Sequence, residues 1–447
     1  MFNRAVLLQL QEWKTTEPRK PLILRGARQV GKTSVVRMFA EQFDEYLEFN
    51  LEKPSDFDLF EHSLEAKELL QLLLLSRNKS GKGQVLIFID EIQNSPSAIK
   101  ILRYFFEEVP HIHLISAGSL LEIVMETKGM SFPVGRVDFL NMYPLTFKEF
   151  LTATGETGLL EQLELDHIHL SFHALLLKCF HKYALIGGMP EVVHHFSEHR
   201  DVPGLNSIYN ALLTAYMDDI EKYAPTSAMK KVLRHCLEMA PFEAGQRIKY
   251  AGFGQSNYGS KEVGEALKIL ERAMVVQLII PSTSLQIPIV PDFKKSPKLQ
   301  FLDTGLVNYF AGLQQHYFVQ DDLHSIHRGL IAEHIATQEF IALRNNRLKK
   351  TCFWVRENSS SNAEVDLLSQ YNEQLIPIEI KSGTTGRLRS LHSFIDIAQQ
   401  PHAVRISSAP LSVENIQTIQ GRPYRLIHIP FYWAGDLDRI LSSVLEK

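Results

Sequence analysis

The chain has 447 residues, a mass of 51.1 kDa, a formal net charge of −4 and a pI near 6.5. Hydrophobic residues make up 45% and charged residues 22% of it, which is typical of a folded globular protein with room for roughly two to four domains. The near-neutral charge argues against a surface coated with basic side chains for nucleic acid, although a local basic patch stays open.

Three cysteines, Cys179, Cys236 and Cys352, lie far apart and leave an odd count. This usage predicts a reducing compartment, for which the cytoplasm is the default, and no zinc site. No segment reaches the roughly 18 apolar residues that a membrane-spanning helix needs, and residues 1–20 lack the apolar core and cleavage site of a secretory signal. The sequence therefore predicts a cytoplasmic protein with no membrane partner.

Residues 1–150 alternate between strand and helix patterns. The expected strands cover residues 21–25, 46–51, 85–90 and 112–117, and the expected helices cover residues 32–42, 63–76 and 97–107. Such alternation predicts an α/β domain with a parallel sheet covered by helices, and it places ligands at the carboxyl ends of the strands.

A complete phosphate-binding loop, Gly-Ala-Arg-Gln-Val-Gly-Lys-Thr, directly follows the first expected strand. Its glycines let the backbone curl around phosphate oxygens, Lys32 can reach the outer phosphates, and the Thr33 hydroxyl can ligate Mg²⁺. The sequence therefore predicts that this segment binds ATP with Mg²⁺. The residues expected at the nucleotide are Gly26, Ala27, Arg28, Gln29, Val30, Gly31, Lys32, Thr33 and Ser34.

The apolar strand expected over residues 85–90 ends in two carboxylates, Asp90 and Glu91. An apolar strand has no structural need for two acids at its end, whereas a magnesium site does. We expect Asp90 to hold the metal and Glu91 to polarise the water that attacks the γ-phosphate. The sequence thus predicts ATP hydrolysis with Lys32 and Glu91 as catalytic residues, although slow turnover or a switch-like role would use the same side chains.

Beyond residue 150 the apolar residues recur at helical spacing, which predicts a helical lid over residues 151–225. Short helices over residues 227–273, followed by strands over 275–281 and 285–291, are typical of a winged helix, which we expect over residues 226–291. The segment 227–273 holds eight Lys or Arg against five acids. That excess is too small to decide between a nucleic-acid contact and a packing module.

Residues 292–447 return to a mixed α/β pattern, which we expect to be a further domain. A basic, proline-interrupted linker over residues 294–298 stands near its start. The expected helices cover residues 329–343 and 390–398, and the expected strands cover residues 351–357, 363–370 and 375–381.

A second group of charged residues lies on two of these strands. Because side chains alternate along a strand, Asp366 lies with Glu364 on one face, and Glu379 lies with Lys381. Adjacent strands would present Asp366, Glu379 and Lys381 together, where carboxylates can hold Mg²⁺ or Mn²⁺ and a lysine can activate water for attack on a phosphodiester. Glu333 on the preceding helix is a further candidate ligand. Alternation of isoleucine with solvated charge explains the spacing equally well, although nearly every residue on this face is a metal-ligand or general-base type.

Together these features resemble a family of prokaryotic AAA+-type ATPases that join an N-terminal P-loop domain to a C-terminal domain related to restriction endonucleases. The resemblance covers nearly the whole chain, and it is specific because several short motifs occur in one order. The motifs are residues 26–33, Asp90-Glu91-Ile92-Gln93, Ala117-Gly118-Ser119, Gly135-Arg136, residues 143–147, 187–190 and 301–306, Glu364-Val365-Asp366 and Glu379-Ile380-Lys381.

The resemblance implies further roles in the ATPase part. Ser119 corresponds to the polar sensor of the γ-phosphate, with Ser116 as a competing sensor because Ala117 replaces the threonine often found there. Arg136 resembles an arginine finger that would act on the nucleotide of a neighbouring subunit, and a plain salt-bridging role is the alternative. A homo-oligomer is expected only if the finger role holds.

The resemblance also implies that Asp366, Glu379 and Lys381 correspond to the Asp…Glu-x-Lys core of restriction enzymes, with Glu333 as the helix acid. The expected function is a Mg²⁺-dependent ATPase coupled through the lid and winged helix to a nuclease-like domain that acts on or binds nucleic acid. Two rivals stay open. One is a nucleotide-switched binding or signalling module whose nuclease fold cuts nothing, and the other is a DNA-binding ATPase that remodels without cutting.

Overall fold

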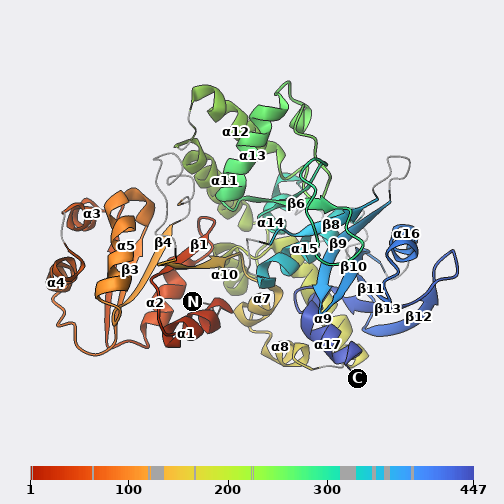
Figure 1. Ribbon diagram of the computed structural model, residues 1–447, viewed down its shortest axis with the longest axis horizontal. Helices are drawn as coiled ribbons and strands as arrows, with labels where there is room; N and C mark the ends of the chain where they lie inside the picture. Colours follow the sequence, from red (N-terminus) through yellow and green to blue (C-terminus); the bar gives the residue numbers. More distant parts are fainter. Residues whose placement is uncertain are drawn as a thin grey trace. The chain divides into compact units, whose positions relative to one another are not determined.

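The computed structural model describes residues 2, 4–62, 65–118, 121, 135–165, 168–222, 224, 226–312, 329–344, 349–356, 363–383 and 387–446. The chain divides into a smaller unit of residues 1–143, 218–227 and 272–274, and a larger unit of residues 144–217, 228–271 and 275–447 (Figure 1). Among the described helices, none is long and apolar enough to cross a membrane.

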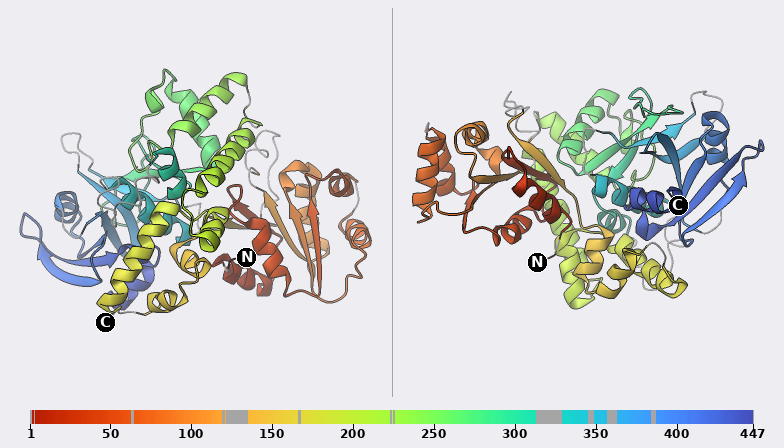
Figure 2. Two further views of the ribbon diagram at one scale, coloured as in Figure 1. Left: turned by 180° about the vertical axis from the view of Figure 1, so that it is seen from behind. Right: turned by 60° about the horizontal axis from the view of Figure 1, so that its bottom comes forward.

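The smaller unit contains a five-stranded parallel sheet with the order β2-β3-β4-β1-β5. Strands β1, β3 and β4 of this sheet are labelled in Figure 1, and the left view of Figure 2 shows the unit from behind. Its strands are β1 (Leu22–Gly26), β2 (Glu45–Asn50), β3 (Val85–Asp90), β4 (His113–Gly118) and β5 (Asp138–Met142). Its helices are α1 (Val6–Thr15), α2 (Lys32–Ala40), α3 (Pro54–Glu61), α4 (Ala66–Ser76) and α5 (Pro96–Glu108), with a short 3₁₀ turn over Ile92–Asn94.

The predicted parallel sheet of the first 150 residues is confirmed, and its central strand shows why the sequence signal is strong. All six residues of β3 are buried, because helices cover both faces of a parallel sheet. Ile87 and Ile89 pack in one core with apolar residues of α4 and α5. Strand β5 was not expected from the sequence, because Phe139 is exposed and polar residues interrupt the apolar ones.

The larger unit begins with a run of helices and no described strand up to β6. The helices are α7 (Phe147–Ala153), α8 (Thr157–Leu163), α9 (Leu170–Ile186), α10 (Pro190–His199), α11 (Leu205–Lys222), α12 (Ser227–Met239) and α13 (Ser260–Arg272). The last turn of α11 and the first residue of α12 belong to the smaller unit. This agrees with the helical character expected between residues 151 and 273, whereas the lid role stays a prediction.

The expected strand over residues 285–291 is wrong. The first strand of that pair exists as β6 (Val276–Ser282), but it pairs with β7 (Lys298–Phe301), and the intervening segment contributes only an isolated bridge between Ser282 and Pro291. Pro288 and Pro291 both lack the backbone N–H that a strand ladder needs, which explains the failure. Residues 226–291 therefore contain no closed hairpin, and the winged-helix prediction is not confirmed.

β6 and β7 instead form one edge of an eight-stranded mixed sheet with the order β12-β13-β11-β10-β9-β8-β6-β7. The expected helices and strands of the C-terminal region are all present within one to two residues at most boundaries. Its remaining strands are β8 (Cys352–Val355), β9 (Glu364–Tyr371), β10 (Gln374–Ile380), β11 (His402–Ser407), β12 (Ser412–Gln417) and β13 (Pro423–Pro430), and its helices are α14 (Thr304–Phe310), α15 (Leu330–Arg344), α16 (Arg389–Ala398) and α17 (Leu437–Leu445).

Three of the short sequence motifs meet in a buried polar network of the larger unit. The fully buried Asp303 accepts hydrogen bonds from the backbone N–H groups of Gly188 at 2.6 Å and Gly305 at 2.9 Å. A side chain at Gly187 would collide with the Asp303 carboxylate, and one at Gly188 would collide with the carbonyl of Leu145. These motifs therefore specify close packing, and we assign them no chemistry.

Candidate functional site

The phosphate-binding loop joins the end of β1 to the start of α2. Gly31 is the N-cap of α2 with φ of 94°, and Gln29 also has a positive φ of 59°. A Cβ at Gly26 would lie 2.6 Å from the carbonyl oxygen of Met142 on the neighbouring β5, so only glycine fits there. The loop thus presents the free N–H groups of a helix N-terminus, which is a favourable place for an anion.

Lys32 is buried against the loop that it would serve. Its Nζ donates to the carbonyl oxygens of Gly26 at 3.0 Å and Ala27 at 2.9 Å. Burial lowers the pKa of Lys32 to about 8, and the nearby carboxylates of Glu91 and Asp90 oppose this shift. The two carbonyl contacts are neutral partners, so a phosphate oxygen would be a stronger acceptor for this ammonium group.

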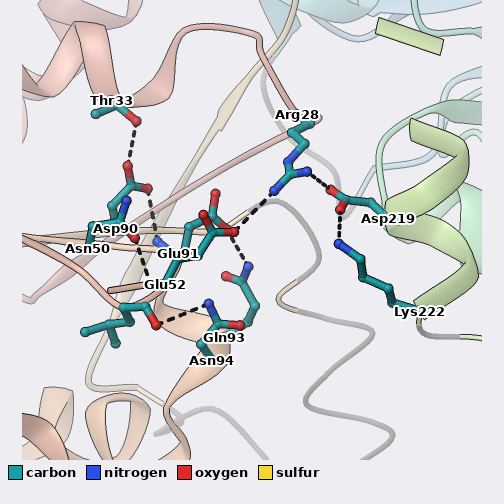
Figure 3. Close-up of polar contacts among 11 residues, drawn as sticks. Arg28, Thr33, Asn50, Glu52, Asp90, Glu91, Gln93, Asn94, Asp219 and Lys222 are labelled. Atoms are coloured by element: carbon teal, nitrogen blue, oxygen red, sulfur yellow. Dashed lines mark hydrogen bonds and ion pairs between the residues drawn. The ribbon is translucent and has the colours of Figure 1, made fainter. Parts of the chain in front are cut away.

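Thr33 and Asp90 meet where the sequence predicts a magnesium site. The Thr33 hydroxyl donates to Oδ2 of Asp90 at 2.6 Å, and Oδ1 of Asp90 accepts from the backbone N–H of Glu91 at 3.0 Å (Figure 3). Asp90 reaches Thr33 from the carboxyl end of β3, although β3 is not a neighbour of β1 in the sheet. A hydroxyl and a carboxylate are oxygen ligands of the kind that Mg²⁺ uses beside phosphates, so this pair fits the expected ion.

Glu91 lies next to this pair in a strained backbone conformation. Its φ of 53° is in the left-handed region, which is uncommon for residues other than glycine and is often found at functional sites. The amide of Gln93 donates to its Oε2, and burial raises the pKa of Glu91. Gln93 is itself buried, and a side chain at Gly118 on β4 would collide with it. Gln93 belongs to the Asp-Glu-x-Gln motif, but the motif alone did not predict a role for it.

A network of ion pairs holds Arg28 of the loop (Figure 3). Its guanidinium lies 2.7 Å from Oδ2 of Asp219 on the last turn of α11 and 3.3 Å from Oε1 of Glu52. Lys222, one turn further along α11, lies 3.1 Å from Oδ1 of the same aspartate. The sequence analysis did not single out Asp219 as a site residue, because nothing near it in the chain points to the loop.

Arg4 is a second residue that sequence reasoning missed. Its guanidinium is buried and donates to the carbonyl oxygens of Val30 in the loop at 2.9 Å and Tyr143 at 2.8 Å. These bonds fix the backbone of the loop from behind. Among the other residues predicted to contact the nucleotide, the side chains of Ala27 and Val30 are buried and that of Ser34 is exposed.

The structure describes only one of the two residues predicted as γ-phosphate sensor and arginine finger, Ser119 and Arg136. Ser119 lies outside the described residues, and the competing Ser116 is buried in β4 with its hydroxyl 3.4 Å from the carbonyl oxygen of Leu22. Arg136 donates to Oε1 of Glu107 at 3.1 Å, a carboxylate that it shares with Arg103. Within one chain Arg136 thus makes a salt bridge, and its action on a neighbouring subunit stays a prediction.

The C-terminal acidic residues surround a lysine that the sequence analysis assigned to a linker. Lys298, the first residue of β7, is buried, and its Nζ lies 2.6 Å from Glu333, 2.7 Å from Glu364 and 3.3 Å from Asp366. These carboxylates raise the pKa of Lys298 and outweigh the opposite effect of burial. We call Lys298, Glu333, Glu364 and Asp366 the lysine-centred cluster.

Glu379 and Lys381 lie beside this cluster and pair with each other. Asp366 lies next to this ion pair, and its Oδ2 accepts a hydrogen bond from the backbone N–H of Ile380 at 2.8 Å. Burial and the charge of Asp366 raise the pKa of Glu379 to about 7, and the same two causes raise the pKa of Glu333 to about 8. The predicted residues do come together, but they are compensated by protein cations.

The lysine-centred cluster does not fit a divalent ion as it stands. Three of its carboxylates already contact one ammonium group, which occupies the place where their charges converge. In the part of the chain that the structure describes, no three or more His, Cys, Asp or Glu side chains are arranged to hold a metal ion. We therefore derive no metal-dependent step at this cluster.

Comparison with known families finds matches to three segments of the chain. Residues 18–151 match the family described as AAA domain. Residues 177–317 match a domain of unknown function (DUF8612), and residues 328–429 match another domain of unknown function (DUF4143). No curated protein matches the chain.

Three solved structures resemble the chain at low sequence identity. The Walker-type ATPase PABY2304 of Pyrococcus abyssi is 13% identical with a TM-score of 0.44, and the match covers 70% of this chain and 96% of that chain. The RuvB Holliday junction branch migration motor of Thermotoga maritima is 14% identical with a TM-score of 0.27, covering 66% and 93%. The Orc1 protein of Aeropyrum pernix, in complex with DNA, is 13% identical with a TM-score of 0.26, covering 72% and 95%.

At these TM-scores the likenesses carry no argument about substrates or partners. The AAA match, the parallel sheet and the geometry of the loop agree with one another without them. The smaller unit accordingly contains a P-loop domain that matches the AAA domain family over residues 18–151.

Proposed function

We propose that the smaller unit binds ATP with Mg²⁺ and hydrolyses it. The observation that carries the proposal is the hydrogen bond between the Thr33 hydroxyl and Asp90, which joins the phosphate-binding loop to the acidic end of β3. Thr33 and Asp90 would hold the ion, which supplies charge neutralisation of the phosphates when it is bound. Lys32 would exchange its two carbonyl acceptors for phosphate oxygens.

Glu91 is the group that would orient the attacking water. Its hydrogen bond from Gln93 holds the carboxylate at one side of the site, so a productive position requires Glu91 to exchange this partner for water. Its raised pKa also makes it a better acceptor for a proton of that water than an exposed glutamate.

The test is the binding and hydrolysis of ATP by Lys32→Ala. We expect hydrolysis to fall to background and MgATP affinity to fall by at least about ten-fold, because the loop loses its charged contact with the outer phosphates. Lys53→Ala, which removes an exposed lysine after β2, is the matched control and should behave as wild type. Unchanged binding and turnover in Lys32→Ala would refute the proposal.

We further propose that the larger unit acts on or binds nucleic acid, as the resemblance to restriction endonucleases implies. The gathering of Asp366 on β9, Glu379 and Lys381 at the end of β10, and Glu333 on α15 supports it. Cleavage would require the ammonium of Lys298 to leave the carboxylates, because those oxygens are engaged in this arrangement.

Incubation of the whole protein with plasmid DNA or RNA, with Mg²⁺ or Mn²⁺ and with or without ATP, separates the candidates. Nicking that disappears in Asp366→Ala would support an enzyme. Retained, salt-sensitive binding without cleavage would support a remodelling or binding ATPase. If the protein neither binds nor cleaves nucleic acid under any of these conditions, the nucleic-acid role is rejected and the nucleotide-switched module is the remaining candidate.

A further inference from the structure

The ion pair between Arg28 and Asp219 lies at the phosphate-binding loop but is not part of the catalytic arrangement proposed above. Arg28 is in the loop itself, and its guanidinium lies between Asp219 and Glu52 (Figure 3). Asp219 is 6% exposed, although it comes from a helix far along the chain. A buried carboxylate is retained in this way only if it is paired.

Arg28 belongs to the same phosphate-binding loop as Lys32 and lies between the loop's two glycines, Gly26 and Gly31. A triphosphate held by Lys32 would therefore also attract Arg28, whose planar guanidinium matches phosphate oxygens as well as it matches a carboxylate. Asp219 and the nucleotide are thus competitors for one cation.

We propose that Asp219 is a positioning residue that withholds Arg28 from the phosphates, so that nucleotide binding and the Arg28–Asp219 pair exclude each other. Lys222, whose Nζ lies 3.1 Å from Oδ1 of Asp219, is a second partner of this aspartate. The buried carboxylate of Asp219 therefore stays paired when Arg28 turns toward a phosphate. Asp219 lies on α11, whose residues 205–217 belong to the larger unit. Nucleotide binding at the loop would therefore break a contact with the last turn of α11.

The inference rests on the proposed binding of ATP and makes an unusual prediction, since removal of a charged contact at the loop should strengthen nucleotide binding. In Asp219→Asn, Arg28 loses one of its carboxylate partners and keeps Glu52, and we expect MgATP to bind about two- to five-fold more tightly, the range that one partly exposed ion pair provides. The gain in affinity should decrease from ATP to ADP to AMP, because the phosphate charge that competes with Asp219 for Arg28 decreases in this order. A purely structural role would not produce that order.

Three variants complete the experiment, with isothermal titration of the whole protein as the measurement. Asp218→Asn changes the exposed neighbour of Asp219 and should bind as wild type. Arg28→Gln should weaken ATP binding, and Arg28→Gln/Asp219→Asn should bind no better than Arg28→Gln alone, because Asp219 acts through Arg28.

Unchanged or weaker binding by Asp219→Asn would overturn the inference, as would equal gains for ATP and AMP. If wild type itself does not bind ATP, the proposed function fails first. The two failures are therefore distinguishable.

Discussion

The two acidic groups of this protein look alike in sequence and differ in what compensates them. In the smaller unit, Asp90 faces the neutral hydroxyl of Thr33, so its negative charge is available to a cation. In the larger unit, the carboxylates of Glu333, Glu364 and Asp366 already share the ammonium of Lys298. A run of acids at the end of a strand thus predicts a cation, but only the partners decide whether that cation is a metal ion or a lysine.

The pKa shifts express the same difference. In the lysine-centred cluster, burial and the charge of Asp366 raise the pKa of Glu333 to about 8, and the ammonium of Lys298 opposes this shift. In the loop, the pKa of Lys32 is lowered to about 8 because burial disfavours its charge. The loop can therefore receive the negative charge of a triphosphate, whereas the acids of the lysine-centred cluster already meet a protein cation.

The largest expected effect is that of Lys298→Met, which removes the ammonium and keeps the length of the side chain. The carboxylates left behind are half-buried and lose the ammonium that they share, so we expect the free energy of unfolding to fall by about 3 kcal/mol. We also expect Mn²⁺ to restore part of this loss, because the emptied cluster becomes a divalent-ion site. Urea unfolding with and without Mn²⁺ measures both effects.

Lys294→Met, which removes an exposed lysine of the same segment, is the control and should match wild type. Equal stability of Lys298→Met and Lys294→Met, or an equal Mn²⁺ effect in wild type, would contradict the contrast between the two acidic groups.

The next effect concerns hydrolysis. Glu91→Gln keeps the shape of the side chain but cannot accept a proton from water, so we expect kcat for ATP to fall by about 10²-fold with binding retained. Phosphate release and nucleotide binding should be measured together. A parallel loss of binding would mean that Glu91 supports the loop instead of the water.

The dependence of ATP binding on pH is expected to be smaller. Because the pKa of Lys32 is about 8, the free protein loses this positive charge as the pH rises through 8, and MgATP affinity should fall by about ten-fold between pH 7.5 and 9. Lys32→Arg stays charged over this range and should show weaker but pH-independent binding. A flat profile in wild type would show that Lys32 is not the group that titrates.

The smallest expected effect is that of Gln93→Met, which removes the hydrogen bond to Glu91 and keeps the volume packed against Gly118. A hydrogen bond to a charged group is worth about 1.5 kcal/mol, so release of Glu91 should raise basal kcat about three- to ten-fold. A decrease would instead identify Gln93 as a residue that positions Glu91 for catalysis.

Much of the fold was predictable because its signals are local. β3 is a continuous apolar run, the loop is a contiguous motif, and α15 and α16 follow apolar periodicity, so each was placed within a few residues. The failed strand at residues 285–291 had the apolar residues of a strand, but its two prolines weakened a ladder that depends on distant partners. β7 was missed because four residues beginning with a lysine carry no strand signal.

The sequence by itself determined the phosphate-binding loop and the acids Asp90 and Glu91, because their chemistry is written in short contiguous motifs. Only the tertiary structure decided which groups those charges meet. Lys298 contacts Asp366 across 68 residues, and Arg28 meets an aspartate at the end of α11. Charge compensation depends on distances in space, and those distances are fixed by how strands and helices pack.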